Sequence, residues 1–191
     1  ESLGLEKPDI SILSDEFLAD VRAMPQKNIA VQLLERLLKG KVKSVQRMNV
    51  VQAKKYSEML KNSIDKYNKR SIQTSKVIEE LIEIAKEMRK AAERGDDLGL
   101  SQDEVAFYDA LADHMTAKEV LGDDKLRAIA HELTKVIKEN MTIDWNKKDS
   151  ARAKMRITVR RLLKKYGYPP DLQTEAVETV VKQAELMAGS I

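Results

Sequence analysis

The sequence contains no cysteine and few of the residues that build turns and aromatic cores. Without cysteine the chain forms no disulfide and no thiolate metal site, which fits a cytoplasmic protein. Its 191 residues include only 7 Gly and 4 Pro, too few for the many turns of a β-sandwich or β-barrel. Aromatic residues make up 4% of the chain, so aliphatic side chains, alanine and methionine have to build the core.

Long apolar runs are also missing. No stretch approaches the roughly 20 consecutive apolar residues of a membrane-spanning helix, so we expect no membrane partner. The N-terminal residues lack the charged-then-apolar order of a signal peptide. The chain begins with Glu1 instead of Met, and its first residues are polar and include a proline. We therefore expect residues 1–13 to be a linker from the preceding part of a larger chain.

Charged residues at helical spacing are abundant. They form 34% of the chain, against 42% hydrophobic residues, as is typical of long amphipathic helices. The apolar residues recur every three or four positions, and no segment alternates over the length of a strand. The sequence therefore predicts an all-α fold, a multi-helix bundle of about seven to eight helices, two of them long. We expect one domain over residues 14–191, with a soft sub-boundary near residues 95–100.

Capping residues and helix breakers give the expected boundaries in the first half of the chain. Ser14 precedes an acidic first turn and predicts a helix start, and Pro25 predicts its end. A second helix is expected from Asn28 to Gly40, because glycine commonly follows the last helical turn. Two long helices are then expected over residues 44–67 and 72–94, with a break at the glycine and two aspartates that follow.

In the second half, Ser101 with Glu104 three residues later predicts a capping box. The helices expected there cover about 101–111, with a possible extension to 115, then 125–141, 149–166 and 172–187. Methionine commonly fills gaps in helical cores, and four methionines fall on apolar stripes: Met48, Met59, Met88 and Met155. Trp145 lies in a corner between helices, where we favour pinning of a loop to the core over contact with a partner.

Known catalytic motifs do not fit the sequence. A P-loop needs an upstream glycine and a hydroxyl residue after its lysine, but Gly40 has no such glycine and Val42 takes the hydroxyl position. A zincin helix needs a second histidine one turn after His131, where Lys135 stands. His114 lies in another predicted helix. Both histidines are therefore expected to be ordinary surface or half-buried residues.

The string closest to a Mg²⁺ site is Asp123-Asp124-Lys125. It lies at an expected helix start, where aspartates commonly cap the helix, and we favour that role. We accordingly expect no catalytic residue, no metal ligand and no cofactor-binding residue in this chain.

The segment 147–165 is the feature most open to a functional interpretation, since it holds nine basic residues against one acid, Asp149. Its basic residues recur every four positions on one stripe, with apolar residues facing away. Three interpretations stay open: contact with nucleic acid, docking to an acidic protein surface, and a solvated face or one paired with the acids of 79–104. The candidate contact residues are Arg152, Arg156, Arg160, Arg161, Lys164 and Lys165.

A series of strings, in order, resembles a known family. They include Met24-Pro25-Gln26-Lys27-Asn28 and an Asp144-Trp145 corner, and they occupy residues 17–38, 77–82, 106–111, 126–130, 142–145 and 160–170, the last ending in Lys-Tyr-Gly-Tyr-Pro-Pro. Together they resemble the C-terminal helical domain of the R subunit, the motor and endonuclease subunit, of type I restriction enzymes. The resemblance covers roughly residues 17–187.

This resemblance implies a role in assembly. R subunits of the family carry an N-terminal nuclease domain and two motor domains that use ATP and Mg²⁺ to translocate DNA, followed by this helical region. The resemblance therefore implies docking to the methyltransferase and specificity subunits. The alternative, which rests on the basic residues themselves, is direct guidance of duplex DNA by residues 147–165. The family's nuclease and ATPase residues lie in parts of the protein outside this chain, so none is carried over to a position here.

Overall fold

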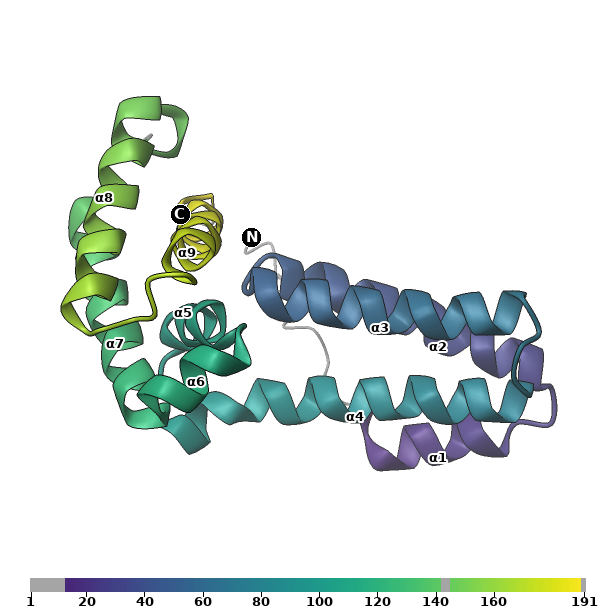
Figure 1. The fold of residues 1–191 in the computed structure, drawn as a ribbon. Coiled ribbons are helices and arrows are strands. Elements are labelled where there is room, and N and C mark those ends of the chain that lie inside the picture. The colour runs from purple at the N-terminus through teal and green to yellow at the C-terminus, as the bar shows by residue number, and fades with distance from the viewer. Residues whose placement is uncertain (1–12, 142–144, 190–191) are drawn as a thin grey trace, which may run out of the picture. The chain divides into compact units, whose positions relative to one another are not determined.

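A computed structural model describes residues 13–141 and 145–189. Within these residues the chain forms nine α-helices, a short 3₁₀ helix, Trp145–Lys147, and no strand (Figure 1). The predicted all-α fold is confirmed, with slightly more helices than the seven or eight expected. In the part of the chain that the structure describes, no helix has both the length and the apolar character needed to span a membrane.

The chain divides into two compact units. Unit 1 comprises Glu1–Val45 and Ala53–Arg94, and unit 2 comprises Gln46–Gln52 and Gly95–Ile191. The turn between the second and third helices thus belongs to unit 2. The expectation of one domain over residues 14–191, with a soft boundary near 95–100, stays a prediction. The expected linker, residues 1–13, lies outside the described residues except for its last residue.

Unit 1 is built from α1 (Asp15–Ala23) and most of α2 (Lys27–Gln46), α3 (Val50–Asn68) and α4 (Thr74–Leu98). Ser14 caps α1 as predicted, because its side-chain oxygen accepts a hydrogen bond from the Phe17 backbone amide at 3.2 Å. Aliphatic side chains dominate the core, among them Leu18, Leu34, Leu38, Leu60, Val77, Leu81 and Ile82.

The predicted end of the second helix at Gly40 is wrong. α2 continues to Gln46, because Val42 and Val45 keep the helical spacing and pack against the core of unit 1. A glycine inside a helix costs about 1 kcal/mol relative to alanine, which the burial of two valines offsets. The third helix accordingly begins at Val50 and not near residue 44.

The turn before α3 is fixed by Asn49, whose Oδ1 accepts a hydrogen bond from the Gln52 backbone amide at 3.1 Å, as a helix cap does. Met48, expected to face inward, is 54% exposed because it lies in this turn and not on a helix stripe. The other three methionines of that group are buried or pack against a core. α4 also exceeds its expected end by four residues and runs to Leu98.

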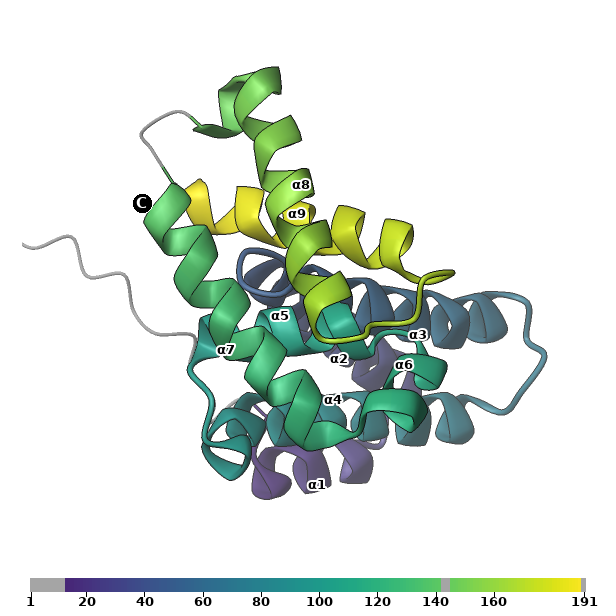
Figure 2. The ribbon, with the colours of Figure 1, turned by 60° about the vertical axis from the view of Figure 1, so that its left-hand side comes forward.

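Unit 2 contains α5 (Gln102–Ala112), α6 (Met115–Leu121), α7 (Asp123–Asn140), α8 (Asp149–Lys165) and α9 (Gln173–Ala188). α5 packs against α7 and α9, and α8 packs against α9 and α7 (Figure 2). The predicted capping box at the start of α5 is confirmed. The separate helix α6 was not predicted, and Met115, a possible end of the preceding helix, is its first residue.

α5 is buried on every side, and it carries a carboxylate into the core of unit 2. All seven residues from 105 to 111 are buried, including Asp109, which is 7% exposed. Asp109 Oδ2 accepts hydrogen bonds from Asn49 Nδ2 at 2.7 Å and from Gln52 Nε2 at 2.9 Å. Gln183 on α9 donates to the Met48 carbonyl at 2.7 Å and accepts from the Val50 amide at 3.0 Å. These contacts satisfy the polar groups of the turn 46–52.

The Lys-Tyr-Gly-Tyr-Pro-Pro string has a structural role at the end of α8. Gly167 takes a φ of 73°, a left-handed conformation that ends helices. Tyr168, 1% exposed, donates from its hydroxyl to the Leu111 carbonyl at 2.7 Å, and burial raises its pKa to about 12. Trp145 is 2% exposed in the same core, so its predicted role of pinning a corner is confirmed.

Candidate interaction surfaces

The two histidines contact separate carboxylates on unit 2. His131 on α7 pairs through Nδ1 with Glu104, the capping-box residue of α5. His114, which precedes α6, lies 3.1 Å from Glu175 through Nε2. Among the residues that the structure describes, no group of three His, Cys, Asp or Glu side chains could hold a metal ion.

The aspartates at the start of α7 have local partners. The cap position is occupied by Gly122, so the expectation that Asp123 or Asp124 caps this helix is wrong; both lie in its first turn. Asp123 accepts a hydrogen bond from the Tyr108 hydroxyl at 2.6 Å, which lowers the pKa of its carboxyl group. Asp124 pairs with Arg127 one turn later. Their carboxylates therefore stabilise the helix start and its contact with α5.

Three of the six candidate cations on α8 form ion pairs inside unit 2. Arg156 donates two hydrogen bonds to Glu178 of α9, from Nε to Oε1 at 2.8 Å and from Nη2 to Oε2 at 3.3 Å. The hydrogen bond to Glu178 raises the pKa of the Arg156 guanidinium. Arg152 pairs with Asp149 of its own helix and lies 3.9 Å from Glu185 of α9.

The third paired cation, Lys165, lies 3.1 Å from Glu132 of α7, and this hydrogen bond raises the pKa of its amine. Glu132 also accepts from the Tyr166 hydroxyl, and the two hydrogen bonds lower the pKa of its carboxyl. The acids that pair with these three cations thus come from α7, α8 and α9. None comes from residues 79–104, so the predicted pairing of the basic stripe with that acidic segment is not formed by these three cations.

The other three candidates, Arg160, Arg161 and Lys164, are exposed and form no ion pair with any described residue. They surround Ile157, a residue 59% exposed and one turn earlier on the same helix face. Lys154, also exposed, lies one turn before Ile157. This face points away from the buried stripe of α8. We call it the α8 outer surface: Lys154, Ile157, Arg160, Arg161 and Lys164.

A second basic surface lies on unit 1, at residues that are not among the six candidates predicted from the sequence. Residues 27–70 hold twelve basic residues and three acidic ones, although the whole chain has a net charge of only +3. We define the α2–α3 basic surface by five exposed residues that form no ion pair with described residues: Arg36, Lys43, Lys54, Lys61 and Lys69. A count of charge in a sliding window would have found it. Apolar residues separate these cations, so no basic run marks them in the sequence.

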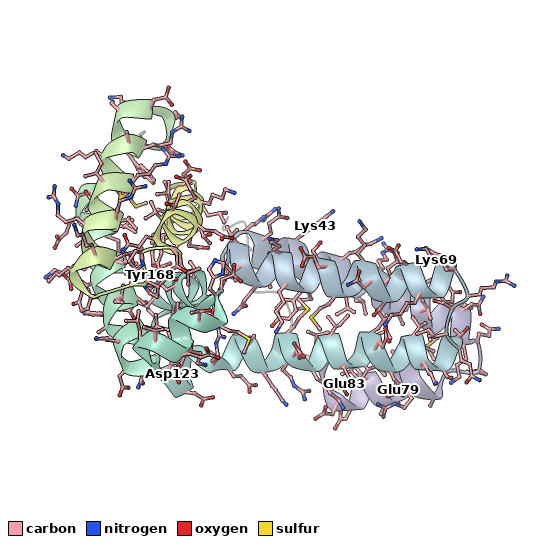
Figure 3. The ribbon with its side chains drawn as sticks, in the orientation of Figure 1. Lys43, Lys69, Glu79, Glu83, Asp123 and Tyr168 are labelled. Carbon is pink, nitrogen blue, oxygen red and sulfur yellow. The ribbon has the colours of Figure 1, made fainter. Side chains whose placement is uncertain are left out.

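The cations of α3 that face α4 are neutralised, unlike those of the α2–α3 basic surface. Lys55 lies 3.2 Å from Glu87, and Lys66 lies 2.9 Å from Glu80, whose pKa is lowered by that bond. Figure 3 shows Lys43 and Lys69 along the edge of unit 1 turned away from α4, whereas Glu79 and Glu83 lie along the edge formed by α4 and α1. Glu79 and Glu83 pair with Arg22 of α1 and Lys86 of α4, so the charges on that edge are largely balanced, unlike those of the α2–α3 basic surface.

Over the described residues the structure thus defines an all-α protein with two helix surfaces that carry exposed cations without an ion pair. Its sequence matches, over residues 1–190, the family described as "Type I restriction enzyme HindI endonuclease subunit-like, C-terminal". The chain belongs to this family, and the resemblance noted from the sequence is confirmed.

Two relatives illustrate the match. The type I restriction enzyme HindI endonuclease subunit of Haemophilus influenzae is 39% identical over 189 residues, which cover 98% of this chain and 18% of the relative. The putative type I restriction enzyme MjaIXP endonuclease subunit of Methanocaldococcus jannaschii is 37% identical over 169 residues, 87% of this chain and 16% of the relative. The chain thus spans under a fifth of the length of either relative. No solved structure was found to match it.

Proposed function

We propose that this chain is the docking module of a type I restriction endonuclease subunit, and that it holds that subunit to the methyltransferase and specificity subunits without catalysis of its own. The larger protein would then be a site-specific deoxyribonuclease that translocates DNA with ATP and Mg²⁺ and acts in the cytoplasm. The family to which the chain belongs supports this setting, since both relatives are named endonuclease subunits.

The observation that carries the docking role is the composition of the α8 outer surface. An isoleucine, 59% exposed, stands in the middle of four exposed cations. Protein interfaces combine an apolar centre with a polar rim and are enriched in arginine. Burying the exposed part of Ile157 against a partner would contribute about 1–2 kcal/mol. The partner surface that fits is an apolar pocket bordered by Asp and Glu.

The alternative role for this helix, direct guidance of duplex DNA, fits the surface less well. Three of the six candidate cations are already bound to carboxylates of unit 2, which leaves Arg160, Arg161 and Lys164 for phosphates. A phosphate backbone also offers no apolar surface to cover Ile157. Docking to a protein uses both the isoleucine and the cations, so it is the stronger interpretation.

The test measures binding of the endonuclease subunit to immobilised methyltransferase complex. We expect the triple variant Arg160→Glu, Arg161→Glu, Lys164→Glu to lower the association rate at least about tenfold at low salt, because charge reversal at a rim acts on the on-rate. The single variant Ile157→Ser should instead raise the dissociation rate, because it removes apolar contact from the centre.

A matched control is available on unit 1. The variant Lys43→Glu, Lys54→Glu, Lys61→Glu changes the net charge by the same amount but leaves the α8 outer surface intact, and should bind the methyltransferase complex like the wild type. Equal slowing in both triple variants, or in neither, contradicts the assignment. A Mg²⁺-dependent nuclease activity of the chain that is lost in an Asp123→Ala, Asp124→Ala variant would contradict the non-catalytic role.

A further inference from the structure

We infer that the α2–α3 basic surface of unit 1 binds the phosphate backbone of duplex DNA without reading its sequence. This inference is independent of the proposed docking role of α8. It starts from the twelve basic and three acidic residues between positions 27 and 70. Proteins that bind DNA non-specifically do so by neutralising phosphates with Lys and Arg, which releases condensed counterions.

The cations of this surface are available to a ligand. Lys55 and Lys66 face α4 and are neutralised by Glu87 and Glu80. The five cations that define the surface have no carboxylate partner among the described residues, and all five are exposed. Neighbouring like charges on a helix face repel one another, so a polyanion that approaches this surface relieves repulsion as well as forming new contacts.

The spacing of the cations suits a phosphate backbone. Arg36 and Lys43 lie two turns apart on α2, and Lys54 and Lys61 lie two turns apart on α3, which places each pair about 10 Å apart along its helix axis. Duplex DNA carries one phosphate per roughly 3.4 Å of axis on each strand, so each pair spans about three phosphates of one strand. Gly40 lies between Arg36 and Lys43, and a shallow depression there, lined also by Lys39 and Glu35, leaves the helix backbone open to close approach.

The residues around these cations distinguish duplex DNA from other polyanionic partners. Of the large hydrophobic side chains that are exposed in the described residues, Ile29 lies two turns before Arg36 on α2, and Met48 lies in the turn between α2 and α3. None lies between Arg36 and Lys43 or between Lys54 and Lys69. A protein partner or a membrane surface would need an apolar anchor among the cations. Single-stranded nucleic acid would need exposed aromatic rings for stacking, but Tyr56 is buried and Tyr67 packs against the core.

The experiment measures binding of the 191-residue chain to a fluorescent 30-base-pair duplex of random sequence by anisotropy, over a series of salt concentrations. The triple variant Lys43→Glu, Lys54→Glu, Lys61→Glu should bind at least about tenfold more weakly at low salt, on every sequence tested. The slope of log affinity against log salt should fall by about three, one for each lost phosphate contact. A second variant with Lys→Gln at the same three positions should show the same fall in the salt slope. Because glutamine carries no charge, this variant distinguishes the loss of phosphate contacts from the repulsion between introduced glutamates and DNA.

The matched control is the reversal of Arg160, Arg161 and Lys164 to Glu, which changes the net charge equally on the other unit. It should bind the duplex within about threefold of the wild type, with an unchanged slope. A thermal melt followed by circular dichroism checks that each variant is folded. If the Glu variant is not folded, the Gln variant takes its place in the binding measurement. The inference is overturned if the wild-type chain does not bind the duplex, if both reversals weaken binding equally, or if a single strand of the same length binds more tightly.

Discussion

The hydroxyl of Tyr168 offers a quantitative test of the packing of unit 2. Its bond to the Leu111 carbonyl, at 2.7 Å, joins the end of α8 to the end of α5 in a core where Tyr168 is 1% exposed. Removing the hydroxyl with Tyr168→Phe leaves that carbonyl without its buried donor. We expect a loss of about 1–2 kcal/mol in the free energy of unfolding at pH 7, measured by urea denaturation.

The effect of pH on this difference follows from the pKa of Tyr168, which burial raises from an ordinary value of 10.0 to about 12. A raised pKa means that the folded state favours the neutral phenol, so the associated stability is complete below pH 10 and is lost as the pH rises through about 12. By pH 11 the wild type should have lost about 1.4 kcal/mol that the phenylalanine variant cannot lose. The gap between the two proteins should therefore shrink by that amount between pH 9 and pH 11.

A gap that stays constant over this range would refute the reasoning, because it would mean that Tyr168 ionises equally easily in the folded and unfolded chain. The other tyrosines and the lysines titrate in both proteins, so their contributions cancel in the comparison. Tyr166, whose pKa is raised by its hydrogen bond to Glu132, is among those that cancel.

Two further changes test the local structure by thermal or urea denaturation. Gly40→Ala should stabilise the chain by about 0.5–1 kcal/mol, because Gly40 lies inside a helix and has open space for the added methyl group. Gly167→Ala should destabilise the chain, because Gly167 has a φ of 73°. Equal effects of the two substitutions would contradict the helix assignment at Gly40. Ser101→Ala should lower the free energy of unfolding by about 1 kcal/mol, because it removes the side-chain half of the capping box of α5, and Ser101→Gly should lower it by only a few tenths of a kcal/mol. An unchanged stability of Ser101→Ala would mean that the capping box does not stabilise the start of α5.

Local signals in the sequence were sufficient to predict most of the helices. Ser14 and Ser101 cap the helices they were expected to cap, because capping depends on residues within one turn. The predicted helix end at Gly40 is wrong for the opposite reason. Its tendency to end a helix is local, whereas the burial of Val42 and Val45 that carries α2 onward depends on the core of unit 1. The same limit applies to Met48, whose exposure depends on where the turn falls.

The contacts between residues far apart in sequence could not be predicted from the chain alone. In the sequence, Asp109 is a single acidic residue within an apolar helix. Nothing near it indicates that it accepts a hydrogen bond from Asn49, a buried residue sixty positions away. The basic stripe of α8 looks uniform in the sequence. In the structure, Arg156 is neutralised by Glu178 of α9, whereas Arg160 forms no ion pair with a described residue. Pairing of this kind decides which cations stay available to a partner, and it requires the packing of the helices.

The docking role of α8 can be tested most directly by chemical crosslinking, because the chain contains no cysteine and a single introduced one is unique. Ile157→Cys, labelled with a short photoreactive group and mixed with the methyltransferase complex, should crosslink to a methyltransferase or specificity subunit. Lys61→Cys, labelled in the same way on the α2–α3 basic surface, should give no crosslink to either subunit. Crosslinks from residue 61 but not from residue 157, or from neither position, would contradict the proposal that this module docks through the α8 outer surface.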